Sequence, residues 1–201
     1  LLSKFKKELF RVSDKIFFIT FSVPSELPSL IKKKFILFLL LKLINSLYFN
    51  TGADDNVGIG TNAGMYTTGA SNTYVGSSAG SGAAGADANN VGVGANALTA
   101  ITTGTINVAV GKDSAKGLTI GRYNIAIGSD ALYTDDVGDR TTAVGLGALY
   151  SQNSDTNNEV TGNTGLGFKT GYSNVTGTNN TYLGYQAGYG GTGSNSNNVG
   201  I

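Results

Sequence analysis

From residue 56 onward the chain repeats a five-residue unit in which branched apolar residues alternate with small ones. In "NIAIG", at 124–128, an Asn is followed by Ile, Ala, Ile and Gly, and "NVAVG" at 107–111 has the same form. With the Asn counted as position one, positions two and four are mostly branched, and position three is mostly Gly or Ala. A period of two is that of a β-strand, so each unit predicts a short strand with positions two and four on one face.

The unit recurs at steps of 16 to 22 residues, most often 17. A ninth unit opens at Asn198 and stops at Ile201, so we expect the sequence to be cut short at its C-terminus. Seven of the eight complete units, and the ninth, begin with Asn, at Asn56, Asn72, Asn90, Asn107, Asn124, Asn163, Asn180 and Asn198, and Thr141 begins the remaining one. The closing glycines are Gly60, Gly76, Gly94, Gly111, Gly128, Gly145, Gly167 and Gly184.

These regularities predict an all-β fold, a parallel β-solenoid (β-roll) of about eight coils of 16–22 residues each. The closing Gly provides a corner with positive φ, and a helix is disfavoured because Gly, Asn and Thr dominate. We expect positions two and four to fill a thin core, and the Asn side chains to form a hydrogen-bonded ladder along one edge. Position three is then the candidate surface for contact with another chain.

Tyr at position ten of four units (Tyr133, Tyr150, Tyr172 and Tyr189) and a few Leu add to the apolar content. Burying two branched side chains per coil stabilises the fold by less than the conformational entropy that ordering the coil costs. Stacking between coils is therefore required, and we expect association into a homo-oligomer as well.

Residues 1–50 form a separate predicted segment, and the repeat domain is predicted over 51–201. The first segment has nine basic and three acidic side chains, a net charge of +6, whereas the second has five basic and ten acidic ones, a net charge of −5. Lys32, Lys33 and Lys34 precede the apolar run "FILFLLL" at 35–41. This pattern is compatible with a signal or membrane anchor, with an amphipathic helix or disordered chain, or with translated flanking sequence that is not native structure.

Composition excludes several kinds of chemistry. The chain has no Cys and no His, which removes thiol and imidazole ligands, disulfides and His-dependent triads. The acidic repeat domain disfavours nucleic-acid binding. The many G-x-G matches recur with every coil and no helix follows them, so we expect no nucleotide site and no cofactor.

Acidic residues occur mostly in predicted turns. The segment "TDDVGD" at 134–139 has oxygen ligands for Ca²⁺ but lacks the spacing of known calcium loops, so solvated turn carboxylates are the favoured interpretation and no metal site is expected. Two carboxylates from different turns could meet as a pair that cleaves glycosides, and the sequence leaves this alternative open. No residue stands out as an activated group, so we expect no enzymatic activity.

The units "NVAVGKDSA" (107–115) and "NIAIGSDAL" (124–132) resemble the head repeats of trimeric autotransporter adhesins, the YadA-like head. The stretch "TGTNNTYLGYQAG" (176–188) is similar to repeats of bacteriophage tail fibres. The resemblance covers residues 52–201. It implies a homotrimeric, left-handed β-roll displayed on a surface, with the Val/Ile-Ala-Val/Ile-Gly core at Val108–Gly111 and Ile125–Gly128.

The expected function is that of a non-enzymatic structural or adhesive fibre segment, extracellular on a cell surface (outer membrane) or on a virion. Its partner would be a surface glycan or protein receptor, contacted through exposed Tyr74, Tyr182 and Tyr185, and a membrane would be involved only through the N-terminal segment. The alternatives are a viral or phage tail-fibre shaft and a carbohydrate-active or ice-binding solenoid module.

Overall fold

The computed structural model describes residues 10–12, 15–17, 55–82, 85–154, 156–157, 159–190 and 193–201. The chain divides into two compact units, Leu1–Ile44 and Asn45–Ile201. In the first unit, β1 (Phe10–Val12) pairs antiparallel with β2 (Lys15–Phe17). These six residues are therefore strand and not helix, while the signal-like run at 35–41 and the predicted boundary at residue 50 lie outside the described residues.

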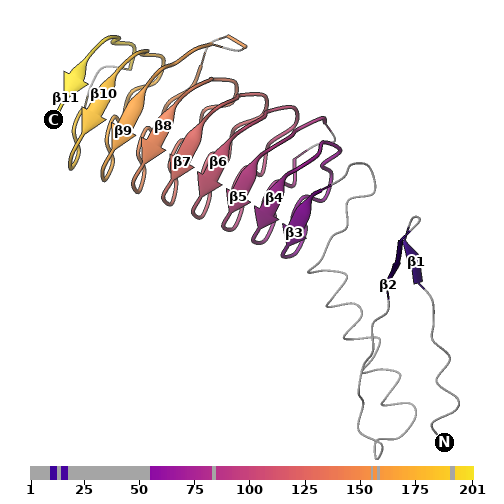
Figure 1. Ribbon diagram of the computed structural model, residues 1–201. Helices are drawn as coiled ribbons and strands as arrows, with labels where there is room; N and C mark the ends of the chain where they lie inside the picture. The colour runs from indigo at the N-terminus through magenta and orange to yellow at the C-terminus, as the bar shows by residue number, and fades with distance from the viewer. Residues whose placement is uncertain are drawn as a thin grey trace, which may run out of the picture. The chain divides into compact units, whose positions relative to one another are not determined.

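The second unit is a parallel β-solenoid, as the sequence predicts. Its nine-stranded sheet keeps the strands in chain order, so each coil of the chain adds one strand beside the previous one (Figure 1). Neighbouring units pair in matching register, with Ala109 opposite Ala126 and Ala126 opposite Ala143. The strands are β3 (Val57–Ile59), β4 (Thr73–Val75), β5 (Val91–Val93), β6 (Val108–Val110), β7 (Ile125–Ile127), β8 (Thr142–Val144), β9 (Thr164–Leu166), β10 (Thr181–Leu183) and β11 (Val199–Gly200).

Each of the strands β3 to β10 is followed by a glycine whose backbone conformation other residues rarely adopt. Gly128, which follows β7, has φ +131°, and a Cβ placed on it would lie 2.5 Å from the carbonyl oxygen of Gly145 in the next coil. The closing glycine is therefore required twice, for its positive φ and for the close approach of the neighbouring backbone. These closing glycines thus lie directly above one another and form the corner of the solenoid.

The two faces of the sheet are reversed relative to the sequence prediction. Position three points into the coil, where Tyr74, Ala109, Ala126 and Ala143 are almost fully buried. Positions two and four, which were expected to fill the core, are exposed or half-buried along the outer face of the sheet. The predicted contact surface at position three is therefore wrong, and the branched residues form the outer face instead.

The interior of the coil is filled from the turn that follows the strand. Position eight supplies a small buried residue, such as Ala97 or Ala131, and position nine supplies Leu98, Leu132 or Leu149. These Leu side chains are fully buried. Where these Leu side chains fill the interior, the strand has room there only for Ala or Gly. This explains why the small residue at position three faces inward.

Candidate functional site

The repeated Asn residues form a ladder inside the solenoid. The Asn107 side chain accepts a hydrogen bond from the backbone N–H of Asn124 at 3.0 Å, and it donates to the carbonyl of Gly121 at 2.8 Å. The same pair of bonds recurs from coil to coil, for example at Asn90. Six of these residues are almost fully buried: Asn72, Asn90, Asn107, Asn124, Asn163 and Asn180.

This ladder differs in two respects from the expected one. It runs through the buried interior and not along an exposed edge, and its regular links join a side chain to a backbone group. Direct amide-to-amide bonds accompany them in places, as between Asn90 and Asn72 at 3.1 Å. At Thr141 the backbone N–H still donates to Asn124, at 2.8 Å, but the side chain pairs with the hydroxyl of Thr161. The Asn residues thus satisfy backbone groups that the coil buries.

Several acidic side chains are buried, which contradicts the expectation of solvated turn carboxylates. Asp87 accepts hydrogen bonds from the hydroxyls of Thr67 and, at 2.6 Å, Tyr74. Burial, followed by the neighbouring Asp87 carboxylate, raises the pKa of Tyr74, which therefore remains a hydrogen-bond donor. Asp139 is 2% exposed and forms an ion pair with Arg122 at 3.1 Å.

The segment considered for Ca²⁺ contains a buried carboxylate that is only partly satisfied. Asp135 accepts hydrogen bonds from the backbone N–H groups of Gly138 and Ser154 and from the Ser154 hydroxyl, all through Oδ1. Its buried Oδ2 has no hydrogen-bond partner in the described part of the chain. The described residues also contain no group of three or more acidic side chains placed to hold a metal ion.

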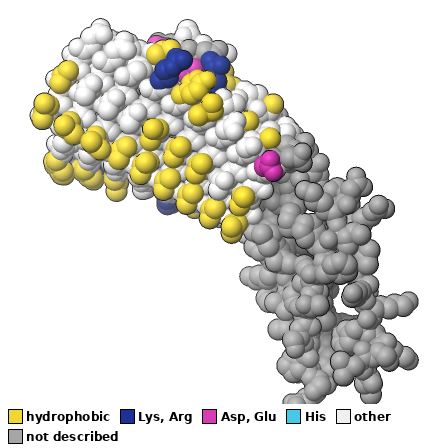
Figure 2. Space-filling model, viewed as in Figure 1, with side chains coloured by type: hydrophobic (Ala, Val, Ile, Leu, Met, Phe, Trp, Pro, Cys, Tyr) yellow, Lys and Arg dark blue, Asp and Glu magenta, His cyan; other side chains and the backbone are white. Residues whose placement is uncertain are grey.

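The outer face of the nine-stranded sheet is an apolar surface, named here the outer sheet face. Figure 2 shows hydrophobic side chains in regular rows along the stack. Among them, Ile59, Val110 and Ile127 are 49%, 36% and 39% exposed. Its two columns are position two (Val57, Thr73, Val91, Val108, Ile125, Thr142, Thr164, Thr181 and Val199) and position four (Ile59, Val75, Val93, Val110, Ile127, Val144, Leu166, Leu183 and Ile201).

A second surface feature is a row of stacked aromatic rings. Tyr133, Tyr150, Tyr172 and Tyr189, one from each of four consecutive coils, are stacked with centroid separations of 4.9, 4.9 and 5.2 Å. Parallel rings at this separation follow directly from the spacing of neighbouring strands. The sequence shows the recurring Tyr, but only the stacking of the coils brings the four rings together.

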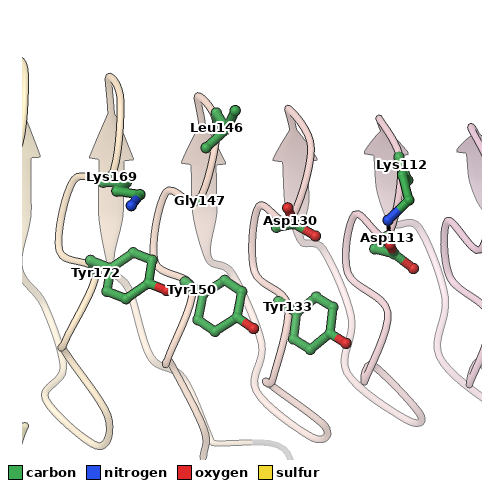
Figure 3. A pocket seen from close by; sticks show the side chains of 9 residues that line it. All are labelled: Lys112, Asp113, Asp130, Tyr133, Leu146, Gly147, Tyr150, Lys169 and Tyr172. Atoms are coloured by element: carbon green, nitrogen blue, oxygen red, sulfur yellow. Dashed lines mark hydrogen bonds and ion pairs between the residues drawn. The ribbon is translucent and has the colours of Figure 1, made fainter.

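The first three of these rings line a shallow groove of about 460 Å³, named here the tyrosine groove. Figure 3 shows the three rings side by side along the stack with their hydroxyl ends pointing the same way. Lys169 lies at one end of the groove, and Lys112 and Asp113 lie at the other. Asp130, Leu146 and Gly147 complete its lining.

Cations and carboxylates have defined places in and beside this groove. Lys116 contacts the Tyr133 hydroxyl at 3.3 Å, and it forms an ion pair with Asp113 at 3.2 Å. Burial by itself would raise the pKa of Asp113, but hydrogen bonds from Lys112, Asn96 and Lys116 outweigh it and hold this pKa at about 2. The Lys169 ammonium lies over aromatic rings, 5.3 Å from the centre of Tyr172 and 5.9 Å from that of Tyr189.

Of the tyrosines expected to contact a receptor, only one is available at the surface. Tyr74 is 1% exposed and Tyr182 is 7% exposed because both are at position three and point inward. Tyr185 is 75% exposed and stacks on Phe168 at 5.1 Å. The contact role assigned to Tyr74 and Tyr182 is therefore wrong.

The predicted membrane involvement concerned the N-terminal segment, 1–50, whose apolar run at 35–41 lies outside the described residues. Within the part of the chain that the structure describes, no helix has the length and apolar character needed to cross a bilayer. No family model, no curated protein and no solved structure matches the chain.

Proposed function

We propose that this chain is a non-enzymatic structural and adhesive fibre segment, displayed outside the cell or on a virion, that assembles as a homotrimer through its outer sheet face. The observation that supports the proposal is the outer sheet face itself. Its apolar side chains are exposed or half-buried and run in register along the sheet. An apolar surface of this regularity marks an interaction site, and the resemblance to adhesin heads favours three copies around one axis.

The register of the sheet supports a parallel arrangement of the copies. Each coil presents one side chain from position two and one from position four at the same height. Three copies in the same direction would therefore pack equivalent residues at every level. A cyclic assembly about an axis along the stack closes this interface and leaves the two ends of each solenoid open to further coils. Such an arrangement is suited to a long, stiff fibre.

One alternative is favoured by the same face. β-Solenoids that bind ice use a flat, regular, exposed sheet, and position two includes Thr73, Thr142, Thr164 and Thr181. The neighbouring column at position four contains only Ile, Val and Leu, however, and so offers no hydroxyl. Self-association is therefore the better explanation of this surface.

The test is the size of the full chain in solution, measured by multi-angle light scattering. We expect a trimer for the wild type and a folded monomer for Ile127→Lys, because a charge in the middle of the outer sheet face would be desolvated on assembly. The matched control is Val160→Lys, which places the same charge on a residue that is 48% exposed and outside the sheet, and this variant should remain trimeric.

Three results would contradict the proposal. A stable wild-type monomer would overturn the assembly. Thermal hysteresis of the purified chain would favour the ice-binding alternative. Release of new reducing ends from a glycan by the purified chain would contradict the absence of enzymatic activity.

A further inference from the structure

The tyrosine groove concentrates the positive charge of an otherwise acidic domain. Residues 51–201 have five basic and ten acidic side chains. Two of the five basic ones, Lys112 and Lys169, line the groove, and a third, Lys116, is bonded to the first ring of its row. Asp113 and Asp130 also line the groove, and Lys112 and Lys116 are both paired with Asp113. Within the described residues, the Lys169 ammonium contacts aromatic rings and forms no ion pair. Its charge therefore favours an anionic group of a ligand at that end of the groove.

The groups in the groove are of three chemical kinds. The row of rings presents aromatic edges and phenolic hydroxyls, and Leu146 adds an apolar contact. Asp130 supplies a carboxylate acceptor, to which the Ser129 hydroxyl donates at 3.0 Å. Lys169 is held by cation–π contacts, which leave the N–H donors of its ammonium available to a ligand.

The equal spacing of these groups indicates a ligand with its own repeat. Rings in consecutive coils are 4.9 Å apart, so an equivalent hydroxyl is presented at each such step along the stack. Linear polysaccharides with equatorial linkages advance by a similar distance per sugar, whereas an extended peptide advances by only about 3.3 Å per residue. The groove is open and shallow, which suits a chain that continues past both ends.

We infer that the tyrosine groove binds a linear acidic polysaccharide along the solenoid axis, with uronic-acid carboxylates at Lys169 and sugar hydroxyls at Asp130 and at the row of tyrosine hydroxyls. Apolar C–H groups of the sugars would contact the ring edges and Leu146. This inference names the class of partner for the adhesive role, and in that respect it rests on the proposed function. It does not depend on the trimer, because each copy of the chain has a complete groove.

The test uses mannuronate-rich alginate, a linear polymer of uronic acids joined by equatorial linkages, and a neutral cello-oligosaccharide of the same length as probes. Isothermal titration of the full chain with oligomers of two, four and six sugars should show binding of the acidic series only. The affinity for the acidic oligomers should rise with their length until one oligomer spans the row of rings. Lys169→Ala should weaken binding at least about tenfold, because it removes a charged hydrogen bond.

A second variant and a control separate recognition from general charge and from misfolding. Tyr150→Phe keeps the stack and removes one hydroxyl, so it should weaken binding by less than Lys169→Ala with no change in the circular dichroism spectrum. Arg140→Ala removes a cation of the same sign that lies over Tyr123, away from the groove, and should leave the affinity for alginate unchanged.

Absence of alginate binding at millimolar concentration would overturn the inference. An equal loss of binding in Arg140→Ala and Lys169→Ala would also overturn it, because general charge would then explain the binding. Equal affinity for the neutral series would refute the acidic ligand. Light scattering on the same samples separates the two proposals: a trimer that binds no alginate contradicts the groove alone, and a monomer that binds it contradicts the assembly alone.

Discussion

The ring of Tyr182 occupies the space that a side chain on Gly188 would fill. The same ring also closes on Gly171 of the preceding coil, where a Cβ would lie 2.6 Å from it. Where position three is Ala, as at Ala143, position nine carries Leu149. A large residue at one of these positions thus fills space left by Gly at the other, in its own coil or in the next one, as Tyr182 and Leu149 do at Gly171.

This relationship predicts a non-additive pair of substitutions. Gly188→Leu should destabilise the fold strongly because the interior is already full, and Tyr182→Ala should cost about 3–5 kcal/mol through the cavity it creates. Gly188 has φ +68°, close to the φ +49° that Leu149 adopts at the same position of its coil, so a Leu can take this backbone conformation. The double variant should therefore be more stable than the sum of the two effects implies, by about 1–3 kcal/mol.

The measurement is the free energy of unfolding of the four proteins in urea. Strict additivity of the two changes would show that the two positions do not share one volume. The backbone strain of Leu at a positive φ is present in both Gly188→Leu proteins and so cancels in the comparison.

The buried ladder predicts a large effect for a single amide. Asn107→Ala would leave the N–H of Asn124 and the carbonyl of Gly121 without their partners inside the coil. At about 1–3 kcal/mol for each unsatisfied buried group, the free energy of unfolding should fall by about 2–6 kcal/mol. The control is Asn153→Ala on an exposed residue, which should stay within about 0.5 kcal/mol of the wild type. Equal effects of the two substitutions would contradict a structural role of the ladder.

The glycine corner predicts that one methyl group is enough to disrupt the stack. Gly128→Ala places a Cβ 2.5 Å from the Gly145 carbonyl oxygen at φ +131°, so we expect a loss of more than about 3 kcal/mol in the free energy of unfolding. Gly190 provides the matched control, because a Cβ there meets no atom within 4 Å. Gly190→Ala should change the unfolding midpoint very little. A Gly128→Ala protein as stable as Gly190→Ala would refute the proposed close approach.

The buried Asp135 predicts a pH-dependent gain in stability. Burial raises the pKa of this carboxyl group above its value in the unfolded chain. The folded state therefore binds the proton more tightly, and the wild type loses stability as the pH rises from the unfolded pKa through the folded one. Asp135→Asn removes the ionisation, so its stability relative to the wild type should increase as the pH rises toward neutral.

The difference between the two proteins should become independent of pH well below the unfolded pKa of about 3.9, where Asp135 is protonated in both states. Thermal unfolding at a series of pH values measures it. Because the comparison is between variant and wild type, the titration of other groups, such as Asp113, cancels. A difference that is constant with pH, or that grows toward acid, would contradict the assignment.

The solenoid could be predicted from the sequence because its determinants are local. The spacing of Asn56, Asn72 and the later units fixes the coil, and the alternation in "NIAIG" fixes a strand of the right length. The need for Gly128 at a corner also follows from one residue and its neighbours. The coil length, the strand and the glycine corner depend only on backbone geometry, and every repeat contains the residues that specify them.

The sequence did not fix which face of the strand points inward, and the prediction that positions two and four fill the core was wrong. A period of two separates Ile125 and Ile127 from Ala126, but it does not say which set is buried. The tertiary structure decides this because Leu132 and Asn124, from outside the strand, fill the interior and leave room only for Ala. The tyrosine groove likewise exists only after stacking, since Tyr133 and Tyr150 are 17 residues apart along the chain and 4.9 Å apart in space. The sequence alone thus determined the repeat and its backbone. Which side chains are buried, which are exposed and where the tyrosine groove forms were decided by the packing of side chains between neighbouring coils.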